Sequence, residues 1–492
     1  MRILLAVLLA ATLGIAAPAR AQWKTVDTPT IKGAYGLVVI PEDWNGSLFI
    51  YAHGYSADER LLQPFPSDVS PANFTARLDT LFQASVLPAI VGKYAIATTT
   101  FRSEGWYVAD AVKDIENLRR YFVKTYGKPK HTYLWGHSGG GMVTSTVIEY
   151  FPHTYEGAMP LCGTGAGARR NFDGAFDLRV AWEYVCKDVP GATFTCGICS
   201  GGSERCTVDA DCGTGRTCSG REDPPDPADG LSRECTEFLL DHPDRFNENP
   251  TSPGGGFVEG PVHACFGDDA AGQARLQRFV ALTQIPASFV VTDMFFASIG
   301  MGEVVHRRTH GKHPWGNDGV TYAPPGFSAA EQAAFNAAAY RSKSDPGAVR
   351  YMRRWYEPRG RTQSKVLTIH ALDDGLVIPE NETKYREAFE ASGRTDQLVQ
   401  LFTPTGGHCG FIAQLLPAIT YITDWVEKGV KPDAAAIAQT SGFTSQTPGP
   451  MGLKVVERRQ KGAPIGSYVC DAGVPSDCPA GTTCDGKRHR CR

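Results

Sequence analysis

A serine in a glycine-rich turn is the first feature of this sequence that could carry chemistry. Ser138 lies in the stretch HTYLWGHSGGGMV (131–143), directly behind a run rich in β-branched and aromatic residues. Gly136 and Gly140 stand two residues before and two after it, and this G-x-S-x-G pattern is typical of a sharp strand-to-helix turn that exposes the hydroxyl. A phosphate-binding loop would need a lysine at its end, and none follows here. The sequence therefore favours a reactive serine.

A serine hydroxyl becomes a nucleophile only when a base takes its proton and a third group orients that base. The glycine-rich stretch PTGGHCGF supplies His408 as the base. The stretch VLTIHALDDGLVIP is an apolar strand that runs into an acidic loop, where Asp373 and Asp374 are both candidates for the orienting carboxylate. The chain order serine, aspartate, histidine is that of hydrolases with a nucleophile elbow.

With these three motifs the sequence resembles the α/β-hydrolase superfamily, in particular secreted esterases with a large cap. The likeness covers roughly residues 46–163 and 364–430. It implies an α/β fold with a mostly parallel, doubly wound sheet, Ser138 as the nucleophile and His408 as general base and acid. In the family's G-x-x-D-x-x-V pattern Ala371 takes the place of the glycine, which favours Asp374 over Asp373 as the acid.

The same resemblance implies an oxyanion hole made of two backbone N–H groups. Gly139, the residue after the serine, supplies one of them. The stretch FIYAHGYS is similar to the family's His-Gly oxyanion loop, which makes Tyr55 the second donor. An ordinary turn at the end of a strand is the alternative interpretation of this stretch.

Cys409, next to the histidine, is reminiscent of the tannase and feruloyl esterase family, where a disulfide ties the histidine loop to the nucleophile. In that family a cysteine precedes the serine, whereas this chain has His137 there. Cys162 ends the predicted strand after the nucleophile helix, so we expect it at the same sheet edge and predict a Cys162–Cys409 disulfide. Buried free thiols at these positions are the alternative.

The elements that must position these residues follow from runs of apolar residues. Nearly continuous apolar runs are typical of strands buried on both faces, as in a parallel sheet. A one-sided apolar pattern with a Gly and a Pro at its end predicts a helix over 108–129, and a second helix-like stretch covers 411–429. The predicted strands are 35–41, 47–52, 94–99, 132–135, 157–162, 365–374 and 398–402.

Roughly 200 residues interrupt this pattern, and we interpret them as a cap inserted over one end of the sheet. The inserted block leans towards helix and includes a capping box at Ser328 and Glu331. The expected organisation is a signal peptide (1–21), a first core part (22–163), the cap (164–363), a second core part (364–430), a linker (431–465) and a cysteine-rich module (466–492).

All 14 cysteines lie at or after Cys162. Two clusters, one in the cap at about 186–235 and one at 466–492, have similar spacing and predict two copies of a small disulfide-knotted module. Zinc is the alternative, but the clusters lack paired C-x2-C motifs. Three cap histidines, His306, His310 and His313, have helical spacing, but an intervening Gly and a following Pro favour a solvated basic patch over a metal site. We expect no metal and no cofactor.

The first residues predict export. An early arginine, an apolar run to about Ala17 and the small-x-small motif at 19–21 are typical of a secretory signal peptide cleaved near Ala21. No later apolar stretch reaches the length of about 20 residues that a membrane span needs. The formal net charge of −3 does not indicate a nucleic-acid partner. We therefore expect an extracellular or periplasmic protein.

Together these features lead to the hypothesis of a secreted serine hydrolase that cleaves small-molecule or polymeric carboxylic esters, aromatic ones included, through an acyl-enzyme on Ser138. A secreted serine peptidase of the same fold is the nearest alternative. A non-catalytic binding or adhesion protein is the third. The cysteine-rich modules could contact a polymer or the cell surface.

Overall fold

The computed structural model describes residues 23–55, 93–103, 105–207, 209–221, 226–242, 256–448, 484–485 and 490–491. The expected signal peptide and its cleavage site lie outside these residues. Of the expected C-terminal module, the described part is the antiparallel pair β13 (Cys484–Asp485) and β14 (Arg490–Cys491).

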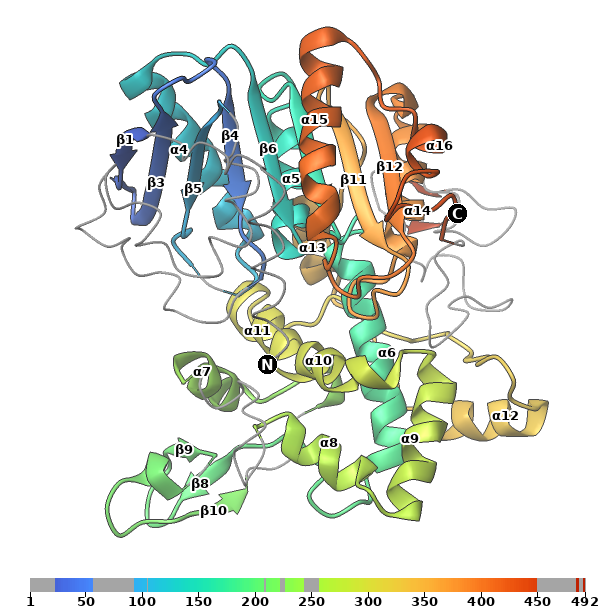
Figure 1. The fold of residues 1–492 in the computed structure, drawn as a ribbon. Coiled ribbons are helices and arrows are strands. Elements are labelled where there is room, and N and C mark those ends of the chain that lie inside the picture. Colours follow the sequence, from blue (N-terminus) through green and yellow to red (C-terminus); the bar gives the residue numbers. More distant parts are fainter. Residues whose placement is uncertain are drawn as a thin grey trace, which may run out of the picture.

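A single large sheet organises the rest of the described core (Figure 1). Its strand order is β1-β3-β5-β4-β6-β7-β11-β12, with β2 paired to β3. β1, β2 and β3 form antiparallel pairs, and all pairs from β5 to β12 are parallel. The predicted α/β-hydrolase fold with a mostly parallel sheet is confirmed. The strands are β1 (Trp23–Asp27), β2 (Thr30–Ile31), β3 (Ala34–Pro41), β4 (Leu48–Ala52), β5 (Ala95–Thr99), β6 (Thr132–His137), β7 (Gly157–Leu161), β11 (Lys365–Ala371) and β12 (Leu398–Thr403).

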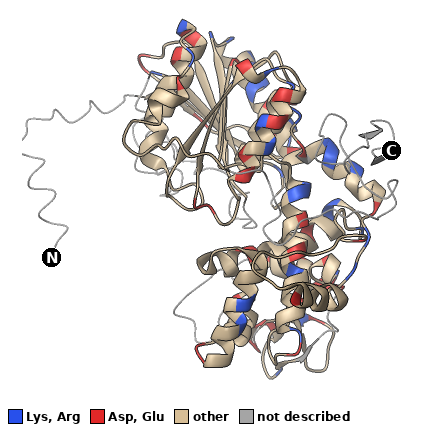
Figure 2. Cartoon of the chain, turned by 90° about the vertical axis from the view of Figure 1, so that its right-hand side faces the viewer, with Lys and Arg blue, Asp and Glu red and all other residues tan. Residues whose placement is uncertain are grey.

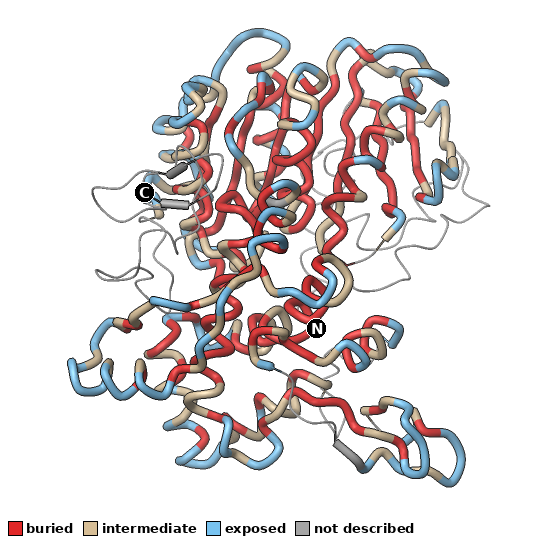
Figure 3. Tube along the Cα trace, turned by 180° about the vertical axis from the view of Figure 1, so that it is seen from behind, coloured by how far each residue is buried: buried red, intermediate tan, exposed pale blue. Residues whose placement is uncertain are grey.

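Both faces of the sheet are covered, which explains why its strands are continuous apolar runs. Every residue of β4 is buried, and alternate residues belong to different clusters: Leu48 and Ile50 pack with α4 (Val108–Tyr126) and α5 (Gly139–Tyr150), whereas Phe49 and Tyr51 lie in the cluster that α15 (Ile412–Lys428) covers. Figure 3 shows the strands buried along almost their whole length. Charged residues lie mostly on the helices and loops instead (Figure 2).

Outside the cap, the predicted helices are confirmed, and two further ones were not predicted. α4 buries Ala111, Ile115, Leu118 and Phe122, and its C-cap Gly127 has φ 93°. α14 (Glu380–Ala391) was missed because its sequence is mostly polar. α16 (Ala434–Ile437) lies in the segment expected to be a linker. Nearby, the N–H of Thr444 donates to the carbonyl of Phe402 at 2.9 Å, so this part of the chain packs on the core.

Most elements of the expected cap, residues 164–363, lie beyond the carboxyl ends of the parallel strands, whereas α13 (Pro346–Tyr356) packs beside α4 and α5 of the core (Figure 1). α6 runs from the sheet edge through the cap, and the predicted capping box at Ser328 and Glu331 is confirmed. The cap elements are α6 (Ala168–Cys186), β8 (Gly197–Cys199), β9 (Arg205–Cys206), η2 (Asp209–Cys212), β10 (Cys218–Arg221), η3 (Pro227–Asp229), α7 (Arg233–Asp241), α8 (Glu259–Phe266), α9 (Ala270–Thr283), η5 (Ala287–Phe289), α10 (Val290–Phe295), η6 (Phe296–Gly300), α11 (Met301–Glu303), η7 (Val304–Arg308), α12 (Ala329–Ala338) and α13 (Pro346–Tyr356). A last turn, η8 (Thr395–Gln397), precedes β12.

The elements from η5 to η7 form one helical run, Ala287–Arg308. Within the described chain it is the run that is long and apolar enough to cross a membrane, with a mean hydropathy of 1.4, and 67% of that stretch is buried inside the protein. Two of its segments, η6 and η7, are π-helical. The expectation that no later stretch reaches this length was therefore wrong, but the burial of the run identifies it as a core helix of the cap.

The ten cysteines from Cys162 to Cys409 form five disulfides, and none of these ten is free. The three sulfurs of Cys199, Cys206 and Cys212 lie close enough to hold a metal ion, but each is already bonded, so no thiolate is available there. The disulfide interpretation of the cap module is confirmed. The pairs are Cys162–Cys409, Cys186–Cys265, Cys196–Cys235, Cys199–Cys212 and Cys206–Cys218.

The three cap histidines do not converge. His306 lies in η7 and bonds the carbonyl of Leu231 through Nε2 at 2.8 Å. His310 has a positive φ of 57°, and His313 lies 3.1 Å from Asp229 Oδ1. Only His306 is helical, so the helical spacing of the three residues does not bring them to one face.

Gly141 allows α5 to pack directly against the end of β7. A Cβ at this position would lie 2.7 Å from the carbonyl oxygen of Leu161 and 2.9 Å from the Cα of Gly163, both backbone atoms that cannot move aside cheaply. We expect Gly141→Ala to lower the free energy of unfolding by about 1–3 kcal/mol, measured by urea denaturation.

The matched control is Gly260→Ala in α8, where a new Cβ would meet nothing within 4 Å. There the substitution should raise stability by about 0.5–1 kcal/mol because alanine restricts the unfolded chain and favours helix. Equal effects of the two substitutions would contradict the packing argument.

Candidate active site

Ser138 occupies a strained turn between β6 and α5. Its backbone has φ 56° and ψ −122°, which a non-glycine residue adopts rarely. A Cβ on Gly136 would lie 2.4 Å from the carbonyl oxygen of Ala52, and one on Gly140 would lie 2.0 Å from the same atom. The glycines of the G-x-S-x-G motif are therefore required by the contact with β4, and they permit the turn that presents the serine.

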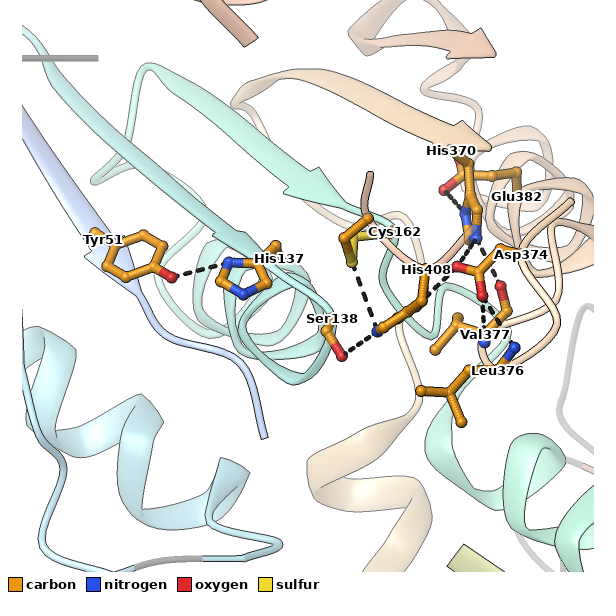
Figure 4. Close-up of a disulfide and its surroundings, with 11 residues drawn as sticks. Tyr51, His137, Ser138, Cys162, His370, Asp374, Leu376, Val377, Glu382 and His408 are labelled. Atoms are coloured by element: carbon orange, nitrogen blue, oxygen red, sulfur yellow. Dashed lines mark hydrogen bonds and ion pairs between the residues drawn. A yellow bond between two sulfur atoms is a disulfide. The ribbon is translucent and has the colours of Figure 1, made fainter. Parts of the chain in front are cut away.

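The structure brings Ser138, His408 and Asp374 together from the ends of three strands (Figure 4). His408 Nε2 lies 2.8 Å from Ser138 Oγ, and His408 Nδ1 lies 2.8 Å from Asp374 Oδ2. In this arrangement the Nδ1–H of His408 donates to the carboxylate, which leaves Nε2 free to accept the serine proton. The geometry is that of a nucleophile, a base and an orienting acid.

Asp373 is not part of this chain of hydrogen bonds. It is exposed, and its Oδ1 accepts a hydrogen bond of 2.8 Å from the N–H of Gly407 in the histidine loop. Asp374 is buried, and its Oδ1 accepts from the N–H groups of Leu376 and Val377 at 3.0 Å each. The carboxylate of Asp374 thus meets donors at both oxygens.

The charge of Asp374 is stabilised inside the protein. Burial raises its pKa, but hydrogen bonds from His370 and His408 outweigh burial and hold the pKa below its usual value. On the other side of Ser138, burial lowers the pKa of His137 to about 4, and His137 Nδ1 lies 2.8 Å from Tyr51 Oη. His137 is therefore neutral and places no positive charge beside the serine.

The two predicted oxyanion donors lie side by side. A Cβ on Gly139 would come within 2.8 Å of the backbone nitrogen of Tyr55, so the two N–H groups belong to adjacent segments of backbone. Tyr55 and Gly139 line one cavity together with Ser138. The arrangement suits stabilisation of a negative oxygen formed at the serine.

Glu303, on α11 of the cap, fixes the oxyanion loop and was missed by sequence reasoning. Its fully buried carboxylate accepts from Tyr55 Oη at 3.0 Å and from the N–H of Trp106 at 2.5 Å. Burial raises its pKa, which the nearby Arg308 partly opposes. No motif marks this residue, because the contact spans 248 residues of sequence.

Ser138 lies between two cavities. The first, of about 120 Å³, is formed mainly by apolar and aromatic side chains of the cap and the core, and Tyr55 and Gly139 line it together with Ser138. Its apolar lining includes Trp106, Phe172, Leu178, Ile285, Phe296 and Val377. The second, of about 340 Å³, is lined by His408, by residues of β6 and by the start of α15.

The predicted Cys162–Cys409 disulfide is confirmed, with a Cα–Cα distance of 5.5 Å. It joins the end of β7 to the residue after His408. Both cysteines have positive φ, 41° and 62°. The bridge therefore fixes the histidine loop to the strand beside the nucleophile turn, as Figure 4 shows.

Protein-family models and curated protein sequences give no match to this chain. Among solved structures it is similar to the rice cell wall degrading esterase LipA from Xanthomonas oryzae, at 13% identity over 87% of this chain and 95% of that chain, with a TM-score of 0.37. For feruloyl esterase B from Aspergillus oryzae the identity is 14%, the coverage 83% and 80%, and the TM-score 0.33. At these values the fold assignment rests on the chain's own topology.

The Cys162–Cys409 bridge closes a loop with a sequence separation of 247, against 13 for Cys199–Cys212 in the cap module. We expect the double substitution Cys162→Ser and Cys409→Ser to lower the free energy of unfolding by about 5 kcal/mol, and the control Cys199→Ser with Cys212→Ser by about 3 kcal/mol, because the longer loop restricts the unfolded chain more. Denaturant titration at one pH measures both. A larger loss in the control pair would overturn this ranking.

Proposed function

We propose that this protein is a carboxylic ester hydrolase that forms an acyl-enzyme on Ser138. The observation that carries the proposal is the pair of hydrogen bonds at 2.8 Å that joins Ser138 to His408 and His408 to Asp374. The adjacent N–H groups of Gly139 and Tyr55 support it, because acyl transfer develops a negative oxygen that needs donors.

In the proposed reaction, His408 Nε2 takes the proton of Ser138 as Oγ attacks the ester carbonyl. The carbonyl oxygen becomes an oxyanion that accepts from the N–H groups of Gly139 and Tyr55. Collapse breaks the ester bond, and the alcohol leaves with the proton from His408. A water molecule, deprotonated by the same nitrogen, then releases the acid and restores the serine. Asp374 holds the ring in the required tautomer throughout.

The cap-side cavity supports an apolar or aromatic acyl group. Ser138 and both proposed oxyanion donors line it, and its mostly apolar and aromatic lining matches an apolar chain or an aromatic ring. The second cavity, which contains His408, suits the alcohol, because His408 must protonate the leaving oxygen. Long acyl chains and aromatic acids, from small molecules or polymers, are thus the proposed substrates.

We further propose that the protein works outside the cytoplasm. The disulfides of the described residues support this, since such bonds persist in oxidising compartments. Contact of the cysteine-rich modules with a polymer or cell surface is proposed on their composition alone.

A panel of aryl esters and peptide anilides tests the reaction class. We expect hydrolysis of the esters, with higher kcat/KM for longer or aromatic acyl groups, and little cleavage of the anilides. Ser138→Ala should lower kcat by about 10⁴–10⁶, because the acyl-enzyme cannot form. Preferential cleavage of anilides would favour a serine peptidase, and an unchanged activity in Ser138→Ala would favour a non-catalytic binding protein with a contaminating hydrolase.

Adjacent aspartates allow a matched test of the acid. Asp374→Asn should lower kcat by about 10⁴, because an amide can stabilise the wrong tautomer of His408. Asp373→Asn should stay within about tenfold of the parent, since it changes one hydrogen bond of the loop. Both are measured on one aryl ester at one pH, and the reverse ranking would make Asp373 the acid.

A further inference from the structure

A fully buried histidine lies directly behind the Asp374 carboxylate. His370, on β11, places Nε2 3.3 Å from Asp374 Oδ2, the oxygen that also binds His408. The same nitrogen lies 2.7 Å from the carbonyl oxygen of Val377, and Nδ1 lies 3.2 Å from Glu382 Oε1 on α14. Figure 4 shows the resulting line of side chains from Ser138 to Glu382.

The partners of His370 require both of its ring nitrogens to donate. Nε2 faces a carboxylate and a carbonyl, and Nδ1 faces a carboxylate, all of them acceptors. A neutral imidazole carries one N–H and would leave one buried nitrogen against an acceptor. The other oxygen of Glu382, Oε2, accepts from Thr368 Oγ1 and Gln400 Nε2 at 2.6 Å each. The geometry thus fits an imidazolium.

The electrostatics agree with the geometry. Burial lowers the pKa of His370, but its interactions with Asp374 and Glu382 outweigh burial and raise that pKa to about 10. His370 therefore keeps its charge over the pH range in which His408 must act as a base.

We propose that His370 is a positioning residue of this site: its imidazolium, held by Glu382, fixes Asp374 and offsets part of the negative charge that Asp374 presents to His408. The inference rests on the proposed ester hydrolysis. In this proposal the His370 imidazolium is a single cation that pairs with both Asp374 and Glu382. Without that cation His408 would face two buried negative charges, which would keep it protonated up to a higher pH. A protonated His408 cannot take the proton of Ser138.

The other charged and titratable groups near this line, among the described residues, do not supply a second cation. Tyr385 on α14 interacts with Glu382, and the exposed Asp373 bonds the histidine loop. From the side of β4 and β6, His53 and His137 both have pKa values lowered by burial and are neutral. His370 is thus the cation that balances this part of the site.

The first test compares pH profiles of kcat/KM on an aryl ester. In His370→Gln we expect the acid limb to move up by about one pH unit, and kcat at pH 7 to fall about tenfold with KM within twofold, because a neutral amide cannot offset Asp374. His131→Gln is the matched control, since His131 precedes the opposite end of β6 and should leave the profile unchanged. An unshifted limb in folded His370→Gln overturns the proposal.

Glu382→Gln provides the opposite change of charge. Removing this carboxylate makes the surroundings of His408 less negative, so the acid limb should stay in place or move down. If His370 and Glu382 served only in packing, both variants would lower the amount of folded enzyme, and neither would shift the pH profile. An upward shift in Glu382→Gln equal to that in His370→Gln would count against the charge-balance argument.

A third measurement needs no activity and no variant at position 370. In protein labelled with ¹⁵N-histidine, one imidazole ring should carry protons on both nitrogens at pH 8.5. This signal should persist in His313→Gln, which removes another histidine whose pKa is raised, in that case by Asp229. Absence of such a ring overturns the proposal even if His370→Gln does not fold. A failure of the proposed function would be distinguishable from this. Ser138→Ala would then keep the esterase activity, and the doubly protonated histidine ring would still be observed.

Discussion

The close contact of α5 with the sheet is the constraint on which the site depends. Gly136 and Gly140 let the chain turn against the carbonyl of Ala52, and Gly141 lets the helix lie against the end of β7. This packing holds Ser138 in its strained conformation above the ends of the parallel strands. The loops after β11 and β12 begin at the same edge of the sheet, so Asp374 and His408 reach Ser138 from fixed positions.

Sequence reasoning was most successful where the signal is local. Buried parallel strands are continuous apolar runs, and α4 has an apolar stripe with a glycine at its end, so both were found to within a few residues. The G-x-S-x-G turn, the acidic loop and the histidine loop were identified by short patterns next to these elements. The Cys162–Cys409 bridge followed from the expectation that two loops share one sheet edge.

The parts that could not be predicted depend on distant contacts. α14 has few apolar residues, because it carries Glu382 and Asn381 for polar contacts with β11 and the cap instead of a wide apolar face. Glu303 and His370 stand in ordinary apolar sequence, and their partners come from other elements. His370 stands four residues before Asp374, but the sequence assigns no role to a histidine in an apolar strand until its neighbours in the fold are known.

The contact of Glu303 with Tyr55 also bears on how this cap could be exchanged among related folds. An inserted domain that merely covers a site can be replaced by another one as a unit. Here the inserted residues supply the acceptor for the tyrosine whose backbone forms half of the proposed oxyanion hole. Recombination or design that transplants the cap must therefore move Tyr55, Trp106 and Glu303 together, and the boundary of the transferable unit runs through the proposed active site, not around it.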